Sequence, residues 1–111
     1  MTLSSDRRST PRFLAKEGGK FTYGLASADI RDLSMDGVFV LDRDPLPVGS
    51  ELAFTLLTGG AEIELEGIVR HVVEEHGMGI QFLNVSILSK RRLRIYLATL
   101  APAPSQLVNA E

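Results

Sequence analysis

Residues 30–40 read Ile-Arg-Asp-Leu-Ser-Met-Asp-Gly-Val-Phe-Val, a short polar stretch between two runs that favour β-strands. Asp32, Ser34 and Gly37 fall where one strand is expected to end and the next to begin. Asp and Ser side chains bond nearby backbone groups and glycine tolerates a positive φ, so these residues can serve only to shape a turn. The same layout would also present a carboxylate and a hydroxyl at the end of a stiff sheet.

The residues on both sides of this stretch predict further short strands. Upstream, strands are expected at 13–16 and 21–30, joined by a Gly-Gly turn within 17–20. The others are expected at 37–41, 51–57, 62–73 and 77–82. A bulge or sharp bend is predicted near Gly67, where the alternation of apolar and polar residues is interrupted. Six short strands separated by Gly- and Pro-containing turns predict a mainly β fold, a small six-stranded antiparallel β-barrel, because closure leaves no open sheet edge.

One C-terminal α-helix is expected after the strands, over residues 87–100, with Asn84 or Ser86 as its N-cap. Helical spacing places four side chains on one face for packing on the barrel: Leu93, Tyr96, Leu97 and Leu100. Leu88 and Ile95 fall on the other side of the helix. That pair either is ordinary exposed apolar surface or contacts a partner.

The length and composition favour a single domain with polar ends. The chain has 111 residues, of which 44% are hydrophobic and 23% charged, as in soluble globular proteins. Residues 1–12 are expected to form a flexible arm, 13–100 the barrel and helix, and 101–111 a disordered tail. No run of about 20 apolar residues or signal sequence is seen, so no membrane insertion and a cytoplasmic location are expected. The absence of cysteine excludes disulfides and thiolate metal sites.

The formal charge of −2 is unevenly distributed. Eleven acidic residues and only three arginines lie between Asp29 and Glu75. Basic residues gather instead near the two ends of the chain: Arg7, Arg8 and Arg12, and Lys90, Arg91, Arg92 and Arg94. An acidic body would repel a long nucleic acid, which needs an extended basic footprint. A small anion held by a local group of arginines fits this distribution better.

The sequence offers little for catalysis or for a metal. His71 and His76 have no spacing typical of metal ligands and no evident serine and acid partners. The acids Glu62, Glu64 and Glu66 share one strand face and are explained by exposure to water. No phosphate-binding GxxxxGK[ST] loop is present. We therefore expect no enzyme activity, no catalytic residue, no metal site and no cofactor.

Two motifs together suggest a family. Arg8-Ser-Thr-Pro-Arg12 reads RxxxR, and Asp32-Leu-Ser34-Met-Asp-Gly37 reads DxSxxG. In this order, together with the six expected strands and a C-terminal helix, they resemble the PilZ domain family, from about Arg7 to Leu100. The resemblance implies a receptor for the bacterial second messenger cyclic di-GMP. It also implies that Arg8 and Arg12 hold guanine edges and phosphates, and that Asp32 and Ser34 complete the site.

The resemblance implies two further roles, and it leaves other functions open. Gly37 is expected to permit the turn, and Arg7 occupies a position at which family members with arginine tend to take the ligand as an intercalated dimer. The signal would pass to an unidentified output protein. One alternative is a PilZ-like interaction adaptor that binds no nucleotide. Another is a small RNA-binding barrel using Lys90–Arg94, although such barrels usually offer exposed aromatic rings, and Phe39, Phe54 and Phe82 are expected in the core.

Overall fold

The computed structural model describes residues 11–15 and 19–100. Within these residues the chain forms seven strands followed by one helix. In chain order they are β1 (Phe13–Leu14), β2 (Lys20–Tyr23), β3 (Ala26–Leu33), β4 (Gly37–Leu41), β5 (Glu51–Leu57), β6 (Glu62–Val73), β7 (Gly77–Leu83) and α2 (Ile87–Leu97).

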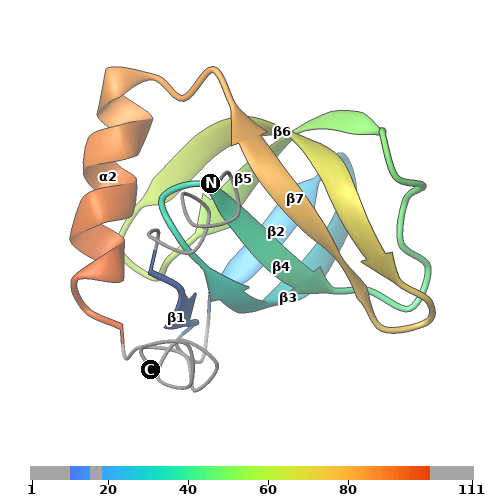
Figure 1. Ribbon diagram of the computed structural model, residues 1–111. Coiled ribbons are helices and arrows are strands. Elements are labelled where there is room, and N and C mark those ends of the chain that lie inside the picture. Colours follow the sequence, from blue (N-terminus) through green and yellow to red (C-terminus); the bar gives the residue numbers. More distant parts are fainter. Residues whose placement is uncertain (1–10, 16–18, 101–111) are drawn as a thin grey trace, which may run out of the picture.

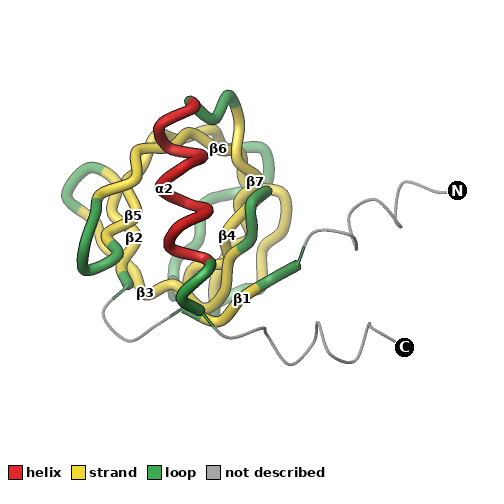
Figure 2. Tube along the Cα trace, turned by 90° about the vertical axis from the view of Figure 1, so that its left-hand side faces the viewer, coloured by secondary structure: helices red, strands yellow, loops and turns green. Residues whose placement is uncertain are grey.

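Six of these strands form a closed antiparallel barrel. The order around the sheet is β3-β2-β5-β6-β7-β4, and β4 pairs back onto β3 to complete the ring. The short strand β1 is an additional strand beside β3, where Phe13 pairs with Leu33. Figure 1 shows the barrel with the helix beside it, and Figure 2 shows the helix crossing the open end of the ring. The predicted fold class, a small six-stranded antiparallel barrel with one C-terminal helix, is confirmed.

The prediction of one strand over 21–30 is wrong. The segment is a tight hairpin in which β2 pairs with β3 from Lys20↔Asp29 to Tyr23↔Ala26. Gly24 supplies the positive φ of +57° that the turn requires, and Leu25 beside it is fully exposed. The strand expected at 13–16 is limited to Phe13–Leu14 and lies outside the ring, so the ring contains six strands but not the six expected. The Gly-Gly turn expected at 17–20 falls largely outside the described residues.

The barrel is filled by apolar side chains from every ring strand. On β4, for example, Val38 and Val40 are 1% and 0% exposed and point inward. The helix adds Leu93, Tyr96 and Leu97, and Leu100, three residues beyond the end of the helix, completes the four side chains expected from helical spacing. The helix therefore completes the core at one end of the barrel, and Leu88 and Ile95 on its other side are 54% and 62% exposed.

The helix begins as expected and ends earlier than expected. Ser86 is its N-cap, because the Ser86 hydroxyl accepts a hydrogen bond from the Ser89 N–H at 3.0 Å. The α-helix ends at Leu97, three residues before the predicted end. The Thr99 N–H and hydroxyl both donate to the Tyr96 carbonyl, at 2.9 and 2.7 Å, and this tightens the last turn out of α-helical geometry.

The irregularity expected at Gly67 lies three residues later, where the pairing of β6 with β7 shifts between Val69 and His71. Gly67 is regular strand, and its lack of a side chain has a packing reason. A Cβ atom there would lie 2.7 Å from the carbonyl oxygen of Gln81 on the neighbouring strand.

Over the described residues, no helix has both the length and the apolar character needed to cross a bilayer.

Candidate functional site

A bulge in β3 places two charged neighbours on the outer wall of the barrel. The pairing of β3 with β4 shifts between Ile30 and Asp32, which leaves Arg31 as the extra residue. Ile30 and Leu33 both belong to the core, so the residues between them are turned outward. In a regular strand, adjacent side chains would point to opposite faces. Here Arg31 and Asp32 meet on one face, and their side chains bond to each other.

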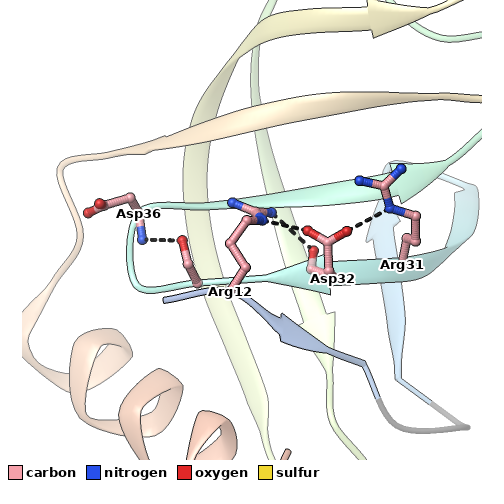
Figure 3. Close-up of polar contacts among 5 residues, drawn as sticks. Arg12, Arg31, Asp32 and Asp36 are labelled. Atoms are coloured by element: carbon pink, nitrogen blue, oxygen red, sulfur yellow. Dashed lines mark hydrogen bonds and ion pairs between the residues drawn. The ribbon is translucent and has the colours of Figure 1, made fainter. Parts of the chain in front are cut away.

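Asp32 forms ion pairs with two arginines, Arg12 and Arg31. The Arg12 Nε donates to Asp32 Oδ1 at 2.6 Å, and the Arg31 Nε donates to Asp32 Oδ2 at 2.6 Å (Figure 3). Arg12 Nη2 also approaches the Asp32 carbonyl oxygen at 3.4 Å. The Asp32 side chain is 7% exposed, whereas those of Arg12 and Arg31 are 36% and 55% exposed. Arg12, Arg31 and Asp32 form a charged cluster with one more positive than negative charge. The two arginine side chains expose that charge to solvent.

Ser34 shapes the turn that follows β3. It is 1% exposed, and its hydroxyl accepts a hydrogen bond from the Asp36 N–H at 3.0 Å (Figure 3). The Ser34 N–H donates to the Gly37 carbonyl at 2.8 Å, which closes the turn into β4. Because a hydroxyl can accept and donate at the same time, the Ser34 hydroxyl can still donate its own proton to another group. The serine thus has a structural role in the turn that begins two residues after Asp32.

Gly37 does not use the positive φ that glycine tolerates, because it is absent from the positive-φ positions of the described chain. Glycine is required there by a close approach. A Cβ atom at Gly37 would lie 2.5 Å from the carbonyl oxygen of Ile80 on β7. The glycine of the DxSxxG motif therefore lets β4 lie close to β7 at this point.

Arg31 is the member of the cluster that the motifs did not indicate. Its Cζ atom lies 4.0 Å from the centroid of the Phe39 ring, a cation–π contact. Phe39 is only 6% exposed, yet it lies outside the core cluster, because Val38 and Val40 on either side point inward. The sequence shows that an arginine directly precedes the motif aspartate. Only the bulge in β3 brings the Arg31 side chain to the same face as Asp32.

The structure therefore connects some of the predicted site residues directly. Arg12 and Asp32 are in contact, and Ser34 and Gly37 form the turn that follows. Arg7 and Arg8 lie outside the described residues.

The histidines and acids form no metal site in the described chain, where no group of three or more potential ligands is found. His71 and His76 are both exposed, and His76 Nδ1 lies 2.8 Å from the Glu74 carbonyl. Burial, followed by the negative charges of Asp42 and Asp44, raises the pKa of Tyr23 above its usual 10.0. That phenol therefore stays protonated at neutral pH.

A groove of about 510 Å³ lies on another part of the barrel, near the start of α2. Tyr23, Phe54, Glu64 and Ser89 are among its lining residues. None of Arg12, Asp32, Ser34 and Gly37 lines it. The candidate site is thus an exposed charged surface on the barrel wall and not this groove.

The aromatic rings are not displayed as stacking platforms for RNA. Phe54 and Phe82 lie in the core, at 4% and 7% exposure, as expected. Phe39 is also buried, but on the outer wall beneath Arg31. The basic side chains of α2, at Lys90, Arg91, Arg92 and Arg94, are exposed, whereas these three rings are buried. This arrangement weakens the RNA-binding alternative.

The fold defines a small antiparallel β-barrel domain closed at one end by a helix. Comparison with protein families then identifies the family to which this domain belongs. The chain belongs to the PilZ domain family, whose model matches residues 6–99. That match contains both motifs, all strands of the described barrel and the whole of α2. No curated protein matches the chain.

Several solved structures share this fold. The PilZ domain of YcgR from Escherichia coli, solved with c-di-GMP, is 19% identical with a TM-score of 0.69, over 85% of this chain and 91% of that one. MrkH of K. pneumonia, solved as a c-di-GMP complex, is 23% identical with a TM-score of 0.67, over 80% of this chain and only 50% of MrkH. The Legionella protein Lpg0364 is 17% identical with a TM-score of 0.62, over 79% of this chain and 90% of that one.

Proposed function

We propose that this PilZ domain is a receptor for cyclic di-GMP, with a binding and not a catalytic role. In this proposal Arg8 and Arg12 hold guanine edges and phosphates, and Asp32 and Ser34 complete the site. Arg7 extends it toward an intercalated ligand dimer, and Gly37 supports it through the close packing of β4 on β7.

The observation that carries the proposal is the contact between Arg12 and Asp32. One residue comes from each of the two motifs, and the fold joins them on an exposed part of the barrel wall. The family membership and the c-di-GMP complexes of YcgR and MrkH support the choice of ligand. In an acidic chain with a net charge of −2, Arg12 and Arg31 meet at Asp32, and such a local group of cations suits a small dianion better than a polyanion.

The chemistry of the groups agrees with that ligand. Cyclic di-GMP carries two phosphates and two guanines. Guanidinium is planar and always charged, and it forks onto phosphate oxygens or onto guanine O6 and N7. The Asp32 carboxylate accepts from the N–H groups on the guanine edge, since each of its oxygens has a second lone pair beyond its bond to an arginine.

Signal output is proposed to pass through the N-terminal arm. Ligand binding orders residues 5–12 against the barrel, at an entropic cost of about 1–2 kcal/mol per residue that the ligand contacts must exceed. The ordered arm and the ligand together form a new surface, which a partner protein recognises.

Isothermal titration calorimetry with cyclic di-GMP tests the proposal. The intact chain is expected to bind, with cyclic di-AMP binding much more weakly because adenine lacks the guanine N1–H and N2–H donors. Arg8→Ala and Arg12→Ala are each expected to lose roughly 2–5 kcal/mol of binding free energy while the barrel stays folded. Arg43→Ala is the matched control, because Arg43 is also exposed but lies in the β4–β5 loop. No binding by the intact chain, or equal affinity in all three variants, would overturn the proposal.

A further inference from the structure

Arg31 is held by contacts on two sides. Its Nε bonds Asp32 Oδ2 at 2.6 Å, and its Cζ lies 4.0 Å from the centre of the Phe39 ring. Asp32 beside it and Phe39 beneath it restrain the guanidinium group on two sides. The side chain is nevertheless 55% exposed, so it remains accessible to a ligand.

The ring beneath Arg31 is itself well supported. Phe39 pairs with Asp32 on β3 and with Gly79 on β7, which places its ring in the middle of the outer wall. A Cβ atom at Gly77 would lie 2.7 Å from Phe39 Cε1, and one at Gly79 would lie 3.6 Å from Phe39 Cδ2. The absence of a side chain at Gly77 leaves room for the Phe39 ring to lie close against the strand. Phe39 is therefore a buried support at 6% exposure, and Arg31 is the exposed layer above it.

We propose that Arg31 and Phe39 form a preformed stacking platform for one guanine base of the ligand, an element of the site outside both motifs. The proposal rests on the proposed function. Guanidinium planes stack on purine faces, and a guanidinium already restrained loses little freedom when it does so. A base stacked on Arg31 lies beside Asp32, whose carboxylate accepts from the guanine N1–H and N2–H groups. The platform supplies affinity for a purine, and Asp32 supplies the preference for guanine over adenine.

The test is titration of cyclic di-GMP into the intact chain and into Arg31→Lys. Lysine keeps a positive charge near Asp32 but has no plane on which a base can stack. The affinity of Arg31→Lys is expected to fall about tenfold. Arg91→Lys, at an exposed arginine on α2, is the matched control and is expected to bind as the unmodified chain does. Phe39→Leu, checked for folding by circular dichroism, is expected to weaken binding in the same direction.

A second readout separates stacking from an indirect effect through Asp32. In the complex with the unmodified chain, nuclear Overhauser contacts are expected between guanine H8 and the Arg31 Hδ protons. Unchanged affinity in Arg31→Lys would overturn the platform, and so would weakened binding without these contacts, since Arg31 would then act only by positioning Asp32. If the unmodified chain binds no cyclic di-GMP, the proposed function itself fails, which is a different outcome.

Discussion

The Nε atom of Arg12 lies 2.6 Å from Oδ1 of Asp32, although the two residues are 20 positions apart in the sequence. The contact ties the residue just before β1 to the outer wall of β3. Asp32 is buried enough that its carboxylate needs compensation for lost hydration, and Arg12 and Arg31 provide it together. The acid of one motif is thus stabilised by an arginine of the other.

Asp32→Asn is the most direct test of this contact. The amide keeps the shape of the carboxylate but loses its charge, so both arginines lose an ionic partner. The free energy of unfolding is expected to fall by about 1–3 kcal/mol, and the affinity for cyclic di-GMP by at least about tenfold. Urea denaturation and calorimetry measure the two effects.

Asp29→Asn on the same strand is the matched control for Asp32→Asn. Asp29 forms an ion pair with Lys20, but its side chain is 62% exposed. Exposed pairs contribute little, so a change of about 0.5 kcal/mol or less is expected, without effect on binding. Equal losses of stability and affinity in the two variants would show that the cluster around Asp32 has no special role.

Ser34→Ala is expected to destabilise the turn between β3 and β4. The Asp36 N–H would lose the hydroxyl that accepts its hydrogen bond, at a position that is 1% exposed. A loss of about 1–2 kcal/mol in the free energy of unfolding follows, together with weaker ligand binding. Ser27→Ala, at an exposed serine of β3, is expected to change stability by about 0.5 kcal/mol at most. Native stability and native affinity in Ser34→Ala would exclude the role given to the hydroxyl.

Gly37→Ala tests whether the motif glycine is needed for packing. The new methyl group would lie 2.5 Å from the Ile80 carbonyl oxygen, which is backbone and cannot turn aside. We expect a destabilisation of roughly 1–3 kcal/mol, measured by urea denaturation. Gly60→Ala is the control, because a Cβ atom there meets nothing within 4 Å. If both variants unfold at the same urea concentration, β4 and β7 must adjust more freely than the structure implies.

Much of the fold could be predicted because local pattern and tertiary burial agree. Val38 and Val40 alternate with outward residues on β4, and the apolar face of α2 is the face that completes the core. The hairpin within 21–30 was missed because Phe21, Tyr23 and Leu25 alternate as they would in one continuous strand. In the structure Leu25 lies in the turn and is fully exposed, and the inward residues change from odd positions on β2 to even positions on β3, where Ala28 pairs with Phe21 and Ile30 is buried.

The candidate site was only partly predictable for a related reason. Motif residues indicated Arg12 and Asp32, and the structure brings them together. Arg31 could not be assigned to the same face, because in a regular strand a residue adjacent to Asp32 would point to the opposite side. The bulge in β3 reverses that expectation, and neither its position nor the contact of Arg31 with Phe39 has a signature in the sequence.

Limited trypsin digestion tests the proposed ordering of the arm. Trypsin cleaves after Arg7, Arg8 and Arg12, and saturating cyclic di-GMP is expected to slow cleavage at these sites because residues 5–12 fold against the barrel. Cleavage after Arg43, an exposed residue of the β4–β5 loop, serves as the internal control and is expected to keep its rate. Arg12→Ala is expected to abolish protection after Arg7 and Arg8. Equal slowing at Arg43 and in the arm would indicate general stabilisation by the ligand, and unchanged cleavage in the arm despite binding would show that the signal leaves by another route.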